Sequence, residues 1–161
     1  MLKNNIRKMQ DDDLDVILKW RNHPSIRNSM FSHNELDFNT HYLWYQSAKV
    51  NPDKHLLIFE SASEPLGFVS FSRCSYGDVF DWSFFVAPNM KKGTGTTMCQ
   101  LAINYAFDTL GLHKICGRVI SFNSVSIALH EKLGFTREGL LRKHYLRSEN
   151  YYDVLCFGLL R

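Results

Sequence analysis

The chain has 161 residues, of which 45% are hydrophobic, 14% aromatic and 22% charged, a composition typical of one folded globular domain over residues 1–161. Its formal net charge of +3 is too small to indicate nucleic-acid binding, and the acidic stretch at 11–15 dilutes any basic surface. No apolar run reaches the length of a membrane span, and the basic N-terminus lacks the apolar stretch of a secretory signal, so we expect a cytoplasmic protein without a membrane partner.

The four cysteines are spread along the chain without a Cys-x-x-Cys pair, at Cys74, Cys99, Cys116 and Cys156. In a chain without an export signal this usage favours reduced thiols over disulfides. His113 and Cys116 have the spacing of two metal ligands, but no second pair accompanies them, so the sequence predicts no metal.

Two helices are predicted near the N-terminus. Apolar residues recur at helical spacing over 14–20, and the stretch 22–24, which includes a proline, ends that helix. A second helix is predicted over 39–48, with Asn39 or Thr40 as its N-cap.

Strands are predicted next, because 55–61 and 66–73 are rich in Val, Ile, Leu and Phe. The turn-like "ASEP" between them indicates an antiparallel hairpin. A third strand is predicted over 79–87 and ends at Pro88.

From there the pattern changes to alternating helices and strands. A glycine loop leads into a long helix, which Thr94 or Thr96 would cap and Gly111 would end. The strand "KICGRVIS" follows, then the helix "NSVSIALHEKLG", which Gly134 would end, and two further strands at 135–147 and 151–161 close the chain. This order predicts an α/β fold with a mixed sheet, with parallel pairing only around the long helix.

The loop "KKGTGTT" stands directly after a strand and at a helix start. Gly93 and Gly95 would let the backbone approach a bulky anion, which the first N–H groups of the helix would bind beside Lys91 and Lys92. A tight turn with solvated lysines explains the loop equally well. It is neither a Walker loop nor a Rossmann fingerprint, because the residues that complete those motifs are missing.

The combination of this loop with the later stretch "NSVSIALHEKLGF" resembles the GCN5-related N-acetyltransferase (GNAT) family. The loop "MKKGTG" carries Met90 where the family usually has glutamine or arginine. The later signature is matched at Asn123, Ser126, Leu129, Lys132, Gly134 and Phe135. The resemblance covers nearly the whole chain and implies a mostly antiparallel twisted sheet flanked by helices, two splayed strands forming a cleft, and acetyl-CoA as co-substrate.

Within the family, the stretches "KWRNHPSIRNSMFS", "HYLWYQSA" and "REGLLRKHYLRSENYYDVLCFGL" resemble enzymes of pseudaminic acid biosynthesis, which serves flagellin glycosylation. The resemblance implies acetylation of the 4-amino group of a UDP-linked amino-deoxy sugar, a small-molecule nucleotide-sugar partner and a homodimer as one possible assembly. The alternatives are acetylation of ribosomal-protein N-termini or of polyamines and, in a different class, a catalytically silent acyl-CoA sensor.

The resemblance also implies the residues that bind acetyl-CoA. Backbone groups around Phe84, Phe85 and Val86 would pair with the pantetheine arm, and an N–H there would polarise the thioester carbonyl. The remaining candidates are the loop and helix residues Lys91, Lys92, Gly93, Thr94, Gly95, Thr96, Asn123 and Ser126.

Three residues are candidates for the chemistry. Asp81 and Ser83 alternate on one strand and therefore share a face of the sheet, where Asp81 could accept the proton of the amine and Ser83 could position a water. The alternative interpretation is that Asp81 is a surface residue of an alternating strand without a catalytic role. His130 stands where the family usually has a tyrosine that protonates the CoA thiolate, so the resemblance predicts a proton donor there, against the alternative of a packing residue.

The acceptor would meet residues of the N-terminal half. Arg21, Asn22 and His23 at a helix end would either cap that helix or clamp the diphosphate or uracil. The other candidates are the pair Met30 and Phe31, the helix stripe His41, Trp44 and Tyr45, which alternatively faces the core, and Arg73 at a strand end.

Overall fold

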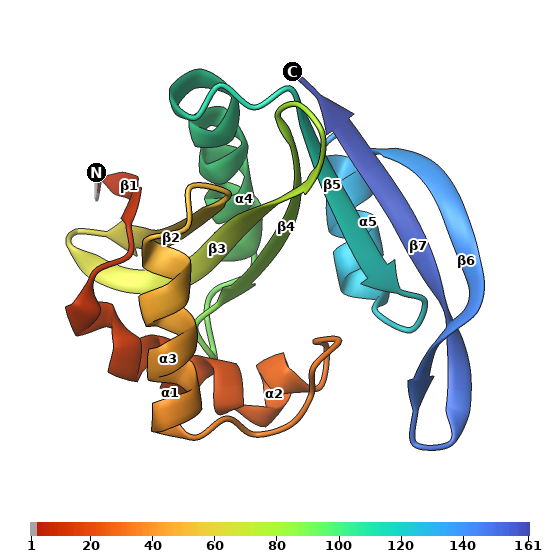
Figure 1. Ribbon diagram of the computed structural model, residues 1–161, viewed down its shortest axis with the longest axis horizontal. Coiled ribbons are helices and arrows are strands. Elements are labelled where there is room, and N and C mark those ends of the chain that lie inside the picture. Colours follow the sequence, from red (N-terminus) through yellow and green to blue (C-terminus); the bar gives the residue numbers. More distant parts are fainter. Residues whose placement is uncertain (1–2) are drawn as a thin grey trace.

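Residues 3–161, which the computed structural model describes, form one seven-stranded sheet in the order β1-β2-β3-β4-β5-β7-β6 (Figure 1). The strands are β1 (Asn4–Lys8), β2 (Lys54–Ser61), β3 (Glu64–Ser75), β4 (Val79–Val86), β5 (Lys114–Ile120), β6 (Thr136–Arg147) and β7 (Asn150–Leu160). The helices are α1 (Leu14–Asn22), α2 (Pro24–Arg27), α3 (Phe38–Lys49), α4 (Thr94–Asn104) and α5 (Ser124–Lys132), with a 3₁₀ turn η1 (Asp11–Asp13) before α1 and a π turn η2 (Tyr105–Thr109) after α4. The predicted α/β fold with a mixed sheet is confirmed.

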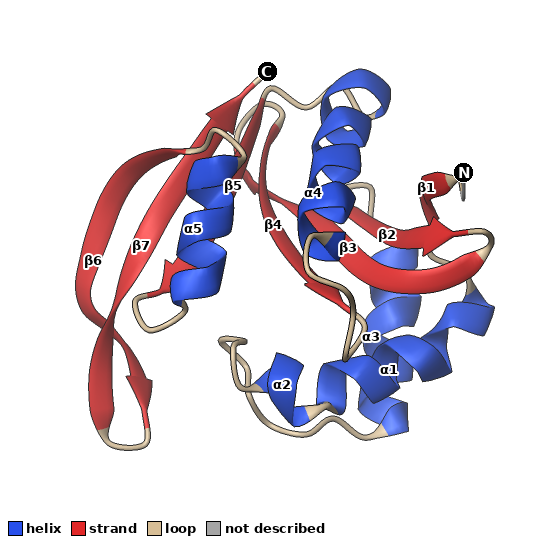
Figure 2. Cartoon of the chain, turned by 180° about the vertical axis from the view of Figure 1, so that it is seen from behind, coloured by secondary structure: helices blue, strands red, loops and turns tan. Residues whose placement is uncertain are grey.

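The two halves of the sheet are joined by β4 and β5, which pair in parallel while the other described pairs are antiparallel. The parallel pairing covers only Val79–Asp81 opposite Lys114–Cys116. Beyond that point β4 stays with β3 while β5 follows β7, so the two strands diverge (Figures 1 and 2). The parallel pair is connected through α4, as the sequence predicts.

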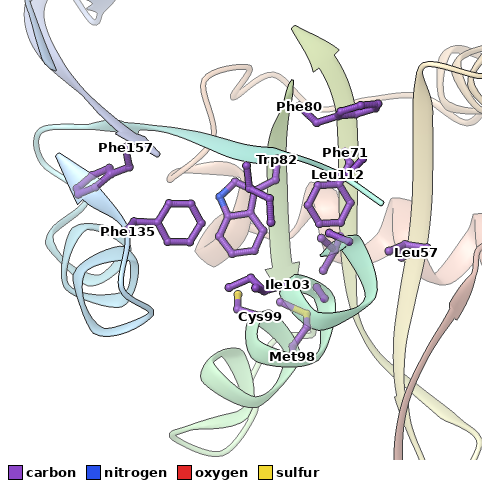
Figure 3. Close-up of a cluster of buried hydrophobic side chains, with 14 of the residues drawn as sticks. Leu57, Phe71, Phe80, Trp82, Met98, Cys99, Ile103, Leu112, Phe135 and Phe157 are labelled. Carbon is purple, nitrogen blue, oxygen red and sulfur yellow. The ribbon is translucent and has the colours of Figure 1, made fainter. Parts of the chain in front are cut away.

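Helices cover both faces of the sheet. α1, α2 and α3 lie on one face, and α4 and α5 lie on the other (Figures 1 and 2). A cluster of apolar side chains fills each interface, and Trp82 lies inside the cluster under α4 and α5, stacked against Phe135 with ring centroids 5.1 Å apart (Figure 3). Among residues 3–161, no helix is long and apolar enough to cross a membrane.

Several boundaries differ from the predicted ones. The short strand β1 is absent from the sequence-based prediction, because its five residues are polar or only partly buried at the sheet edge. α3 is capped by Asp37 and not by Asn39 or Thr40, since the Asp37 carboxylate accepts the Thr40 N–H at 2.9 Å.

α4 also begins differently from the prediction, which placed the cap at Thr94 or Thr96. Its N-cap is Gly93, in the left-handed conformation with φ of 96°, so backbone geometry takes the place of a side-chain cap. Gly111 follows the π turn after α4, and Gly134 follows α5. Both glycines have positive φ, as expected for residues that terminate helices.

The acidic stretch at 11–15 stabilises the N-terminal edge of the sheet. Arg7 donates to both oxygens of Asp13, at 2.7 and 2.9 Å, and also to Glu60 of β2 at 2.7 Å. Asp13 is buried and accepts the Gln10 N–H as well. Burial alone would raise the pKa of Asp13, but these bonds outweigh it and lower the pKa below its ordinary value.

We expect Asp13→Asn to lower the free energy of unfolding by roughly 2 kcal/mol at neutral pH, because Arg7 loses a charged partner in a largely desolvated position. The contribution of Asp13 is present above the unfolded-state pKa of about 3.9 and is lost as the pH falls through the lower folded-state value. Urea titrations of both variants at several pH values measure this. Asp12→Asn, at an exposed neighbouring position, is the control, and an equal effect of the two substitutions would contradict the prediction.

Candidate active site

A cleft of about 780 Å³ opens where β4 and β5 diverge. The C-terminal half of β4 and the end of β5 form its floor, and the starts of α4 and α5 and the α1–α2 region form its walls. The lining residues are 21, 25–26, 29–32, 81–90, 95, 98, 118–120, 123, 125–126 and 129–130.

The β5-facing edge of β4 has no described strand partner after Asp81. Its backbone N–H and C=O groups therefore remain available to an extended ligand that adds to the sheet edge. Phe84, Phe85 and Val86 all lie along this part of the cleft, as predicted. An amide-containing arm such as pantetheine fits the edge by the same pairing that one strand makes with another.

The glycine loop lies at the end of this edge. Gly95 lines the cleft, and a Cβ built on it would lie 3.9 Å from Val86 Cγ1, so the first turn of α4 approaches the end of β4 closely. The first N–H groups of a helix have no intrahelical partners and carry partial positive charge, which suits a pyrophosphate. Lys91 and Lys92 are exposed and do not line the cleft, so they act on an anion only from the loop's outer surface.

The start of α5 forms the opposite wall. Asn123 caps this helix, because its Oδ1 accepts the Ser126 N–H at 3.1 Å. Asn123 and Ser126 both line the cleft, and the Asn123 side-chain NH₂ group is left to donate to a ligand carbonyl.

Asp81 lies at the branch point of the two strands and is opposite Cys116 in the last parallel pair. Its carboxylate forms an ion pair with Arg118 of β5, with Oδ2 3.0 Å from Nη2, and this bond raises the pKa of Arg118. Asp81, Ser83 and Arg118 all line the cleft, so the structure brings the predicted base and its neighbour together at the predicted place. Arg118 was not predicted.

His130 lines the cleft but is only 2% exposed. Its Nε2 accepts the indole N–H of Trp82 at 3.0 Å, and its Nδ1 lies 2.8 Å from the Ser126 carbonyl, to which it donates. Burial lowers the pKa of His130, an effect that the bond to Ser126 only partly offsets. The ring is therefore neutral with its one proton bonded to a backbone oxygen, which is unfavourable for the predicted role as proton donor.

Gly117 of β5 makes this arrangement of His130 possible. A Cβ at Gly117 would lie 2.5 Å from His130 Nε2, which is too close, and 3.1 Å from Trp82 Nε1, which is tight. The imidazole also stacks on Phe157 of β7, with ring centroids 4.9 Å apart. His130 thus joins α5 to strands on both sides of the divergence.

The acceptor side of the cleft contains a buried guanidinium. Arg21, in the last turn of α1, is 8% exposed, and its Nη2 donates to the Ser32 carbonyl. Its Nη1 is buried without a hydrogen-bond partner among the described residues. Burial, together with the nearby charge of Arg27, lowers the pKa of Arg21. Among residues 3–161, no carboxylate forms an ion pair with Arg21. Met30 and Phe31 line the same wall, as predicted.

The β6–β7 hairpin reaches across to this wall. The Tyr145 hydroxyl donates to the Phe31 carbonyl at 2.6 Å and lies 3.2 Å from His33 Nδ1, and the rings of Tyr145 and Phe31 meet edge to face. Arg147 donates to the Asn28 carbonyl in the same region. The contact was not predicted, because its two sides lie far apart in the sequence.

Six predicted acceptor residues do not reach the cleft. Asn22 binds the backbone of Leu36 through both ends of its amide, and His23 caps α2 by accepting the Ser25 N–H. Arg73 lies toward the other end of β3, where it pairs with Asp53 and Asp78. The structure does not bring these three side chains to the cleft, and each of them is bonded within the protein.

The helix stripe His41, Trp44 and Tyr45 also lies outside the cleft. His41 lies 3.2 Å from the Leu14 carbonyl of α1, Trp44 packs edge to face on Phe68, and Tyr45 donates to Asp11. The stripe joins α3 to α1 and the sheet, which is the alternative that the sequence left open.

Comparisons with known proteins agree with this geometry. The family model for the acetyltransferase (GNAT) domain matches residues 5–136. The chain belongs to the GNAT family. It is an acetyl-CoA-dependent N-acetyltransferase with a single GNAT domain fold.

Three GNAT relatives illustrate the range of similarity. The SPbeta prophage-derived N-acetyltransferase YokL of Bacillus subtilis is 30% identical over 97% of this chain and 89% of its own. The acetyltransferase PseH of Campylobacter jejuni is 26% identical over 82% of each chain. The crystal structure of spermidine N-acetyltransferase from Vibrio cholerae in complex with CoA and spermine superposes with a TM-score of 0.90, at 24% identity over 98% of this chain and 95% of that one. The last comparison supports the GNAT fold only.

The position of Gly95 generates a test of the anion site. We expect Gly95→Asp to raise the Kd of acetyl-CoA at least about tenfold, because a carboxylate would face the pyrophosphate. An aspartate in the first turn of a helix is favourable for the helix itself, so folding should be preserved. Calorimetric titration with acetyl-CoA measures the effect. Gly139→Asp, on the exposed strand β6, is the control, and equal affinity of the two variants would contradict the site.

The neutral state of His130 predicts a pH effect on stability. Because burial lowers its folded-state pKa, His130 contributes stability that is present above pH of about 6.5 and is lost as the pH falls toward and through the folded-state pKa. We expect His130→Phe to reduce the slope of unfolding free energy between about pH 5 and pH 7. Burial also lowers the pKa values of His41 and His55, so these two residues account for the slope that remains in the variant. An unchanged slope would mean that folding does not lower the pKa of His130, and would contradict the assignment of a neutral, buried ring.

Proposed function

We propose that this N-acetyltransferase transfers the acetyl group of acetyl-CoA to the 4-amino group of a UDP-linked amino-deoxy sugar, as in pseudaminic acid biosynthesis. The observation that carries the proposal is Arg21, a buried guanidinium on the acceptor side of the cleft with one nitrogen lacking a partner among the described residues. A phosphate oxygen of a nucleotide sugar supplies the missing partner, since guanidinium groups bind phosphate in a forked geometry.

The charge of the cleft supports an anionic acceptor over a polyamine. Among the described lining residues, Arg21 and Arg118 are cationic, and Asp81 is the single carboxylate. That carboxylate is already paired with Arg118. A polyamine carries several positive charges and requires several carboxylates in its site, so the cleft would repel it.

The shape of the acceptor side supports a small molecule. Phe31, held by Tyr145 of the hairpin, and Met30 provide apolar walls against which a uracil or a sugar can pack. Because Tyr145 bonds the Phe31 backbone, the hairpin and the α2 region approach each other over the cleft. A peptide N-terminus with its following residues would need an open groove there.

The positions of the cleft residues support the following steps of the transfer. Arg118 binds one oxygen of the Asp81 carboxylate, which leaves the other to accept the proton of the acceptor's ammonium group directly or through a water near Ser83. The neutral amine then attacks the thioester carbonyl. A backbone N–H on the unpaired edge of β4 stabilises the developing oxyanion. A thiol has a pKa of about 8.5, so the CoA thiolate can leave near neutral pH without His130 as a donor.

Two other acceptor classes and the silent sensor are the alternatives. The polyamine alternative has support from similarity, since the Vibrio cholerae relative is a spermidine N-acetyltransferase. Its sequence identity to this chain, 25%, is close to the 26% of PseH, so overall similarity does not separate the two acceptors.

An acceptor panel tests the proposal. Release of CoA is measured with the UDP-4-amino sugar, with spermidine and with a ribosomal N-terminal peptide at equal concentrations. We expect kcat/KM for the nucleotide sugar to exceed the other two at least about a hundredfold, because only this acceptor pairs with Arg21. A preference for spermidine or the peptide would overturn the acceptor, and binding of acetyl-CoA without transfer to any amine would favour the sensor.

Arg21→Met extends the same experiment. The variant should raise KM for the nucleotide sugar about ten- to a hundredfold while the KM for acetyl-CoA stays constant. Lys19→Met, two residues earlier on α1 and outside the cleft, is the matched control.

A further inference from the structure

We infer that the sheet face beside the cleft contains a site for one thiophilic divalent cation such as Zn²⁺, formed by Cys74, Asp81 and Cys116, and that its occupation inhibits acetyl transfer. The three residues belong to three adjacent strands, β3, β4 and β5. Their ligand atoms all lie within 4.8 Å of one another. The inhibitory part of the inference rests on the proposed role of Asp81 as base, and the binding part does not.

Sheet register brings these three side chains together. Asp81 and Cys116 are directly opposite in the last parallel pair of β4 and β5, so their side chains emerge on the same face. Cys74 lies at the irregularity between Arg73 and Ser75 where β3 pairs with β4. A bulge of this kind changes the direction of the backbone locally. Cys74 itself is exposed. The site is therefore open to solvent on one side.

The positions of the two thiols fit a metal better than a disulfide. β4 lies between β3 and β5, and neighbouring strands are about 4.8 Å apart, so the backbones at Cys74 and Cys116 are separated by roughly 9 to 10 Å. A disulfide needs Cα atoms within about 7 Å. Two thiolates on one zinc are about 3.8 Å apart, given Zn–S bonds of about 2.3 Å and tetrahedral angles. The spacing of the sulfur atoms is thus compatible with a shared ion.

The ligand types select the ion. The two thiolates are soft ligands that favour Zn²⁺ over Mg²⁺ or Ca²⁺, and zinc also accepts a carboxylate oxygen. The open side leaves a fourth position for water. Binding displaces the two thiol protons to solvent. The resulting negative charge is offset by Arg118, whose guanidinium bonds Asp81 Oδ2.

Occupation has a direct chemical consequence. Asp81 lines the cleft, whereas Cys74 and Cys116 do not, so the ion would bind behind the branch point and share only Asp81 with the reaction. A carboxylate bound to a cation is a much weaker proton acceptor. The cation would therefore prevent deprotonation of the acceptor without occupying the acetyl-CoA cleft.

The binding part is tested with Co²⁺ and Zn²⁺ on chelator-treated, reduced full-length protein. We expect one equivalent of Co²⁺ to give thiolate-to-cobalt charge-transfer absorption in the near ultraviolet, and one equivalent of Zn²⁺ to abolish it. Cys74→Ser and Cys116→Ser should each eliminate the absorption. Cys156→Ser is the matched control, because Cys156 is opposite Arg118 in the β5–β7 pairing but outside the three-residue group. Absence of the absorption in the unsubstituted protein, or its persistence in both serine variants, would overturn the site.

The inhibitory part is tested by acetyl transfer to the preferred acceptor of the panel. One equivalent of Zn²⁺ should lower kcat at least tenfold, a chelator should restore it, and Cys74→Ser should keep its basal rate and resist Zn²⁺. Stoichiometric metal binding without inhibition would leave the metal site standing and overturn the role of Asp81 as base. Equal inhibition of Cys74→Ser would show that Zn²⁺ acts elsewhere, and would overturn inhibition through this site.

Discussion

The parallel pairing between β4 and β5 stops after Asp81 and Cys116, and the functional features of the chain depend on this interruption. It exposes a backbone edge for an amide-containing arm, opens the cleft between α4 and α5, and places Asp81 at the floor of that cleft. An uninterrupted sheet would satisfy the same backbone groups internally and leave no position where a thioester and an amine could meet.

Beyond the ion pair of Asp81 with Arg118 at the branch point, packing around His130 holds the two diverging strands in place. Gly117 has no side chain, so His130 can accept the Trp82 N–H close to the β5 backbone. His130 of α5 accepts a hydrogen bond from Trp82 of β4 and stacks on Phe157 of β7, while its other ring nitrogen bonds Ser126 within its own helix. A residue that resembles a catalytic acid by its place in a motif thus packs between strands of the two halves of the sheet.

Local signals in the sequence predict local structure, and this explains which expectations are confirmed. The glycines that end α4 and α5 are correctly identified, because positive φ is a property of a single residue. The stripe His41, Trp44 and Tyr45 does share a helix face, but periodicity does not say what that face contacts. The ion pair of Asp81 with Arg118 joins residues 37 positions apart and has no local signature. The sequence identifies Arg21 as a phosphate-binding candidate from its residue type alone. Only the fold reveals that its charge is buried and has no ion-pair partner among residues 3–161.

The hydrogen bond between Tyr145 and Phe31 has a consequence for the order in which the protein folds. The acetyl-CoA half of the cleft comes mainly from one continuous stretch, 81–130, whereas the acceptor wall needs residues 114 positions apart to meet. Long-range contacts of this kind form late in folding, because closing the long loop lowers the entropy of the chain before the contact stabilises it. Because β7 of the same hairpin also pairs with β5 along its length, both sides of the cleft become defined only when the C-terminal hairpin joins the sheet.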